Sequence, residues 1–111
     1  MNLSSKIKFA DTDVKKTFEE LENSFNEERQ LYKFLVQAFQ NLEENAFAGT
    51  QIPKKQIPKE YIKKYGIDNC WKYNLPNAWR LLYSIARNEV VVLSIVLEWL
   101  NHKNYERRFK Y

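Results

Sequence analysis

The chain has 111 residues, of which 44% are hydrophobic and 29% charged, so it can bury the core of one domain and is too apolar to be disordered. A single Cys and a single His exclude a disulfide framework, a Cys-based zinc cage and a site with several His ligands. No apolar run is long enough for a signal peptide or a membrane span, so we expect a soluble, cytoplasmic protein that does not bind a membrane.

The net charge of +4 conceals an asymmetry along the chain. Residues 1–50 carry 6 Lys/Arg and 9 Asp/Glu, whereas residues 51–111 carry 12 Lys/Arg and 5 Asp/Glu. The basic half also holds all three Trp and most of the Tyr. Cations interleaved with aromatic rings suit a polyanion with exposed bases. A solvated lysine-rich surface over an aromatic core explains the same composition, and composition alone does not decide between the two.

The first half predicts two helices after a short strand. Residues 7–9 are extended enough to form an edge strand, and residues 11–13 offer N-cap chemistry. The first apolar stripe consists of Val14, Phe18, Leu21 and Phe25. After a short break at Asn26-Glu27, the second consists of Leu31, Phe34, Leu35, Ala38, Phe39 and Leu42. Helical spacing in both stripes predicts an antiparallel helical hairpin.

Residues 46–69 interrupt these patterns. Gly49, Pro53 and Pro58 punctuate the segment, and Pro58 suits the first turn of a short helix over residues 59–65 that Gly66 ends. We therefore expect an exposed, mobile connection with one or two helical turns.

From Cys70 onward the pattern favours strands. Residues 70–75 alternate, with Trp71 and Tyr73 on one side and Lys72 on the other. Residues 79–86 and 89–99 predict two more strands joined by a tight turn at Arg87-Asn88, the last lying centrally and buried on both faces. With a short helix in the basic tail, we predict an α+β fold in one domain over residues 1–111: an N-terminal helical hairpin packed on an antiparallel β-sheet.

The two strands after Cys70 resemble the RelE/ParE superfamily of toxins. The resemblance rests on Trp71-Lys72-Tyr73, a short turn, and then Arg80-Leu81-Leu82-Tyr83, followed by a third strand and a tail with His102-Lys103-Asn104-Tyr105. It implies a helical hairpin on an antiparallel sheet and a cognate antitoxin as partner. RelE-like members cleave mRNA on the ribosome, whereas ParE-like members inhibit DNA gyrase. The chain departs from RelE at Asn74, where that family has a second lysine, and in its long connection over residues 51–69.

The resemblance also implies the site residues. Metal-free cleavage of RNA by its own 2′-OH needs a base, an acid and cations that stabilise the phosphorane. Arg80 suits the phosphorane, Lys72 assists, and His102 or Tyr105 transfers protons. Further RNA contacts are expected from exposed cations, namely Lys54, Lys55, Lys59, Lys103, Arg107 and Arg108. No metal and no cofactor are expected.

Each of these residues also has an ordinary structural explanation. Arg80 can pair with a surface carboxylate, Lys72 can be a solvated strand lysine, His102 can be an exposed histidine near a terminus, and Tyr105 can pin the tail. Three hypotheses therefore stand: an endoribonuclease toxin, a gyrase-inhibiting toxin that cuts nothing, and a degenerate member that only binds a partner. The convergence of the cations on one place favours the first, and Asn74 keeps the third open.

Overall fold

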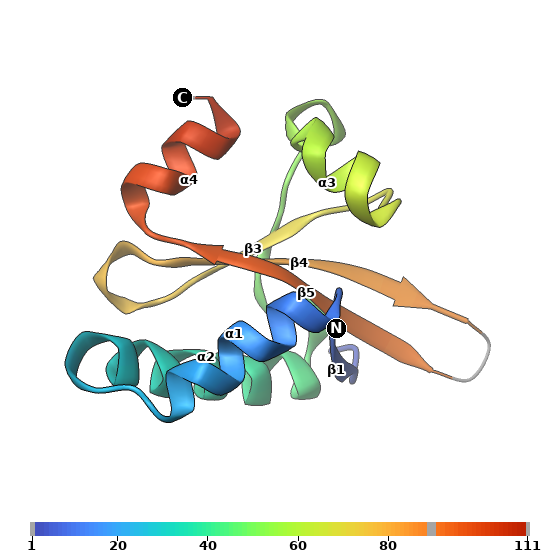
Figure 1. Ribbon diagram of the computed structural model, residues 1–111. Helices are drawn as coiled ribbons and strands as arrows, with labels where there is room; N and C mark the ends of the chain where they lie inside the picture. Colours follow the sequence, from blue (N-terminus) through green and yellow to red (C-terminus); the bar gives the residue numbers. More distant parts are fainter. Residues whose placement is uncertain (1, 89–90, 111) are drawn as a thin grey trace.

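A sheet lies between two layers of helices in the computed structural model, which describes residues 2–88 and 91–110 (Figure 1). Over these residues the sheet has five strands in the order β1-β5-β4-β3-β2. Helices α1 and α2 cover one face, and α3 and α4 stand on the other. The predicted α+β fold with a short C-terminal helix is confirmed. None of the helices in the described part of the chain has the length and apolar character to cross a membrane.

The sheet is mixed rather than antiparallel. Strand β1 (Lys6–Phe9) lies at the edge, as predicted, but pairs in parallel with β5 (Val92–Leu100). The other strand pairs are antiparallel. Because β1 and β5 are separated by most of the chain, no turn constrains their direction, and the local pattern of either strand carries no information about it.

The helical hairpin consists of α1 (Thr12–Glu22) and α2 (Asn26–Glu44). The Asp11 side chain accepts a hydrogen bond from the Val14 N–H at 2.8 Å, so the predicted N-cap is confirmed. The break falls earlier than predicted, because the N–H groups of residues 23 and 24 close α1 on its own carbonyls. Phe25 therefore stands outside the first stripe with 82% of its surface exposed.

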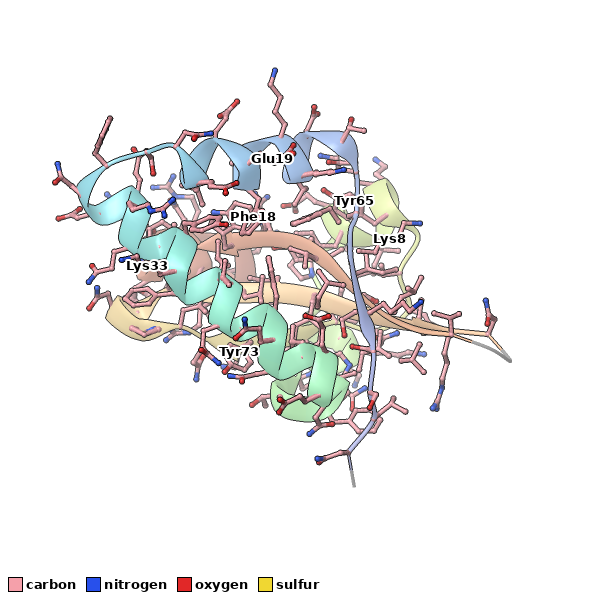
Figure 2. All side chains as sticks on the ribbon, turned by 90° about the horizontal axis from the view of Figure 1, so that it is seen from below. Lys8, Phe18, Glu19, Lys33, Tyr65 and Tyr73 are labelled. Carbon is pink, nitrogen blue, oxygen red and sulfur yellow. The ribbon has the colours of Figure 1, made fainter. Side chains whose placement is uncertain are left out.

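One core fills the space between the hairpin and the sheet. It combines most of the predicted stripe of α2 with Leu75 and residues from two strands, namely Leu31, Leu35, Ala38, Phe39, Leu42, Leu75, Leu81, Tyr83 and Val96. Phe18 packs against Phe39 and Tyr32 with ring centroids 5.1 Å apart in both pairs. Figure 2 views this face and shows α2 lying obliquely across the strands, with α1 beside it. Burial of this apolar face is what stabilises the hairpin on the sheet.

Residues 46–69 pack against the sheet, so the expected exposed connection is wrong. The segment contains two 3₁₀ turns, η1 (Ala46–Ala48) and η2 (Lys54–Gln56), and two further elements, β2 (Thr50–Gln51) and α3 (Lys59–Tyr65). A second core on this side includes Ile52, Ile57, Tyr61, Cys70, Leu82, Leu97, Leu100 and Tyr105. The helix over residues 59–65 is confirmed, and Gly66 ends it with a φ of 64°.

The remaining elements follow the predicted order. They are β3 (Trp71–Asn74), the turn η3 (Pro76–Ala78), β4 (Arg80–Arg87), β5 and α4 (His102–Phe109). Strand β4 lies in the middle of the sheet, whereas β5 lies between β1 and β4. The predicted burial of β5 on both faces holds only in part, because Val92, Leu93 and Ile95 are half-buried. Arg87, which the sequence pattern puts in the turn, is instead the last residue of β4 and pairs with Val92. The predicted strand residues 89–90 lie outside the described residues.

Candidate functional site

Lys72 and Arg80 reach the same face of the sheet from neighbouring strands. In the register of β3 and β4, Lys72 lies opposite Leu82 and Arg80 lies opposite Asn74. Leu82 belongs to the core beneath α3 and α4, so the two cations face these helices. Helix α4 places the Tyr105 ring beside both, with the Lys72 Nζ 5.6 Å and the Arg80 Cζ 5.5 Å from the ring centroid. Three of the four predicted catalytic residues thus lie together.

Arg80 and Lys72 form a cation pair without a carboxylate partner among the residues that the structure describes, since no ion pair within 4.0 Å joins either of them to Asp or Glu. The Arg80 Nε is buried and has no hydrogen-bond partner among the described residues, and Nη1 donates to the Trp79 carbonyl oxygen at 3.3 Å. Leaving a charged donor unsatisfied is costly. An anion beside the pair, such as a phosphate, would be attracted by both positive charges.

His102 lies one helical turn before Tyr105, at the start of α4. Its Nε2 is 2.9 Å from a carboxylate oxygen of Glu106, and its side chain is 60% exposed. Among the described residues, no contact joins His102 to Lys72 or Arg80. His102 therefore lies on the same helix as Tyr105 and beside the cation pair, but it does not contact either cation.

The cations predicted to bind RNA lie on the same side of the sheet. Five of them are exposed, namely Lys54 and Lys55 on η2, Lys59 on α3, and Lys103 and Arg107 on α4. Figure 1 shows α3 and α4 on this side of the sheet. Arg108 differs, because its side chain is only 34% exposed and forms ion pairs with Glu60 and Glu98. An arginine held by two carboxylates acts as a structural tie, which leaves fewer of its donors for RNA than an unpaired arginine would have.

The charge asymmetry of the sequence becomes an asymmetry between the two faces of the sheet. Helices α1 and α2 carry four Lys/Arg and eight Asp/Glu, whereas η2, α3 and α4 carry eight Lys/Arg and two Glu. The cation pair lies beneath the basic layer. A polyanion approaching this side meets a favourable field, and the opposite side repels it.

Sequence reasoning missed the group that ties α3 and α4 to the sheet. Glu98, on β5, accepts a hydrogen bond from the Tyr61 hydroxyl and pairs with Arg108 at 3.2 Å. Burial and this carboxylate raise the pKa of Tyr61 above its usual value, so the phenol stays a donor. The available signal was a lone Glu in the apolar run of the last strand, because a half-buried carboxylate needs partners.

A metal site finds no support in the side chains: within residues 2–88 and 91–110, no three His, Cys, Asp or Glu residues gather closely enough to hold an ion. Cys70 is buried, and burial raises the pKa of its thiol to about 12, so it is not an activated nucleophile.

The helical hairpin packed on a sheet, followed by a short C-terminal helix, is consistent with the RelE/ParE toxin fold. The model of the ParE toxin of type II toxin-antitoxin system, parDE, matches residues 8–97, and the chain belongs to this family. Comparisons with curated proteins and with solved structures find no significant match. Membership implies a cognate antitoxin as partner. The match includes Lys72 and Arg80 and ends before His102 and Tyr105.

Proposed function

We propose that this toxin cleaves mRNA, on the ribosome, as a metal-independent endoribonuclease that acts in the cytoplasm. The observation that supports the proposal is the cation pair: Lys72 and Arg80 converge on one ring without a carboxylate partner among the described residues, and an Arg80 donor is buried without a hydrogen bond. The basic layer formed by η2, α3 and α4 surrounds the pair, and this charge favours an RNA backbone.

In this proposal the RNA supplies its own nucleophile. The 2′-oxygen attacks the adjacent phosphorus, the bond from phosphorus to the 5′-oxygen breaks, and the products are a 2′,3′-cyclic phosphate and a free 5′-OH. Arg80 presents two donors to the phosphorane oxygens and Lys72 adds a point charge. His102 accepts the 2′-OH proton, and the Tyr105 hydroxyl protonates the leaving oxygen. The Tyr105 ring also holds both cations in place.

Gyrase inhibition is the second candidate, because the matching family model is that of ParE rather than RelE. Asn74 supports the same alternative. It lies opposite Arg80 in the register, at the position where RelE-like toxins carry a lysine, so the cluster has one cation fewer than in RelE. A toxin that only binds its target needs a surface rather than a complete set of proton-transfer groups.

One experiment separates these candidates. The purified chain is incubated with labelled RNA, with ribosomes translating a defined mRNA, and with gyrase and relaxed plasmid, all with chelator except the gyrase reaction. The proposal expects RNA fragments ending in a 2′,3′-cyclic phosphate. Arg80→Ala is expected to lose about a hundredfold in cleavage rate, as for one transition-state donor. Lys33→Ala is the matched control, since Lys33 is an exposed cation on the hairpin face (Figure 2).

Cleavage by Arg80→Ala at the wild-type rate, with the fold intact by circular dichroism, rejects the site. Inhibition of supercoiling without RNA cleavage replaces the proposal with the gyrase candidate. Growth arrest on expression accompanies either activity, so it tests the toxin and not the choice of target.

A further inference from the structure

A groove of about 750 Å³ lies where β2, the start of β3 and the distal end of β4 meet. Its apolar lining includes Phe47, Trp71, Ile85 and Ile95, and Lys54 and Arg87 stand at its margins. Lys72, Arg80 and Tyr105 are not among the residues that line this groove. The groove is therefore separate from the proposed phosphate site.

The wall formed by residues 46–49 is held by a buried side chain. The Tyr83 hydroxyl donates to the Ala46 carbonyl oxygen at 2.7 Å and accepts from the Gly49 N–H at 3.0 Å. The Asn45 side chain accepts from the Phe47 N–H at 3.0 Å. These bonds fix the position of Phe47, so the groove is already formed before a partner binds.

The opposite wall is fixed by Asn69. Its side-chain amide accepts from the Ile85 N–H and donates to the Ile85 carbonyl oxygen, both at 2.8 Å, which replaces a strand partner at this position of β4. The sheet surface beyond it carries half-buried apolar residues, including Ala86 and Val92. Val92 belongs to β5, which the sequence pattern predicts to be buried on both faces, and it pairs with Arg87 of the lining. Its half-burial leaves apolar surface that a partner in the groove could cover.

The lining favours a peptide over a nucleobase. The Trp71 ring already packs against Phe47 and Tyr83, with ring centroids 5.5 Å and 6.2 Å away and both rings at about 30° to it, so less of the Trp71 ring is left for a base to stack on. Phe47 itself is 38% exposed and offers an apolar edge. An aliphatic or aromatic side chain fits such a surface, whereas base stacking needs a free ring face.

The charges at the margins specify the rest of the partner. Lys54 and Arg87 are exposed, and neither forms an ion pair with a carboxylate among the residues described. Among the described residues of the lining, Asp68 is the one acidic residue, and its carboxylate accepts a hydrogen bond from the Asn69 amide. Carboxylates on a bound segment would complement the two cations.

We propose that this groove binds an extended segment of the antitoxin in which apolar side chains alternate with Asp or Glu. The apolar side chains pack on Phe47 and Ile85, and the carboxylates pair with Lys54 and Arg87. The inference rests on membership of the toxin family and is independent of whether the toxin cleaves RNA.

The test uses a displayed library of random 12-residue peptides selected on the immobilised full chain. The selected peptides are expected to alternate apolar and acidic residues. Their binding should change the NMR chemical shifts of the backbone amides of residues 66–69 and 85–87 in a ¹⁵N-labelled sample. Phe47→Ala and Arg87→Glu should each weaken the best peptide about tenfold, as for loss of an anchor or of a complementary charge. Lys33→Glu, a charge reversal on the hairpin face, should leave it unchanged. A twelve-residue oligouridylate serves as the RNA probe.

Three results would overturn the proposal. They are a selection that yields no peptide sensitive to Phe47→Ala and Arg87→Glu, a yield of basic peptides, and shifts of the same amides by the oligouridylate alone. RNA cleavage by the toxin does not enter the readout, so a failure of the nuclease proposal leaves this test intact.

Discussion

Replacing Tyr83 by Phe removes one buried hydroxyl and isolates two backbone groups. Tyr83 is fully buried, and its hydroxyl joins the Ala46 carbonyl oxygen to the Gly49 N–H. Burial raises the pKa of Tyr83 to about 12, so the hydroxyl is protonated at neutral pH and donates. Both backbone groups lose this partner in the Phe variant, while the ring keeps its packing.

The expected cost follows from the number of groups left without a partner. A buried polar group without a hydrogen bond costs about 1–3 kcal/mol. With two such groups and some relaxation of residues 46–49, we expect the free energy of unfolding to fall by about 2 kcal/mol. For a domain of this size that lowers the melting temperature by roughly 8–15 °C.

Urea denaturation followed by tryptophan fluorescence and circular dichroism measures the change. Tyr73→Phe is the matched control. The half-buried Tyr73 hydroxyl accepts one bond from the Asn41 side chain, at 2.6 Å, and water can replace it. The control should lose less than about 1 kcal/mol. If Tyr83→Phe is no less stable than Tyr73→Phe, the hydroxyl does not hold residues 46–49 and the argument for a preformed groove fails.

Three further predictions concern single side chains. Asp11→Ala should lower the free energy of unfolding by about 1 kcal/mol, because the helix loses its N-cap. The Val14 N–H holds the pKa of Asp11 below its usual value, so this stabilisation is present above the unfolded-state pKa and is lost as the pH falls through the folded-state pKa. The urea midpoints of wild type and variant should therefore converge in acid, and a constant difference between them would contradict the cap. Gly49→Ala places a Cβ against the Lys72 carbonyl oxygen and should destabilise the fold by about 1–3 kcal/mol. Gly66→Ala should cost less, because a Cβ there meets open space and only the positive φ of residue 66 is strained. A larger loss of stability for Gly66→Ala than for Gly49→Ala in calorimetry would refute this. Cys70 should resist a thiol reagent at pH 8 until urea unfolds the chain, because burial raises its pKa to about 12, and rapid labelling of the native protein would show that the site is open.

The helices and most strands could be predicted because their signals are local. The stripe of α2 repeats at helical spacing and becomes one wall of the core, and Gly66 ends α3 where its free φ allows. Alternation along β3 correctly separated Lys72 from Trp71, since the two side chains of neighbouring strand residues must leave on opposite faces. The resemblance to a toxin family predicts Lys72 and Arg80 as site residues, and strand geometry explains the face that they share.

The rest depended on contacts between residues far apart in the chain. No local signature exists for the parallel pairing of β1 with β5, the anchoring of residues 46–49 by Tyr83, or the ion pairs of Arg108 with Glu60 and Glu98. Gly and Pro marked residues 46–69 as irregular, but irregular backbone packs tightly where a buried side chain satisfies its polar groups. Amphipathic periodicity is encoded residue by residue, and for that reason the sequence alone determined which faces are buried. Only the tertiary structure decided which partner meets each face, because the free energy of such a contact belongs to two distant segments at once.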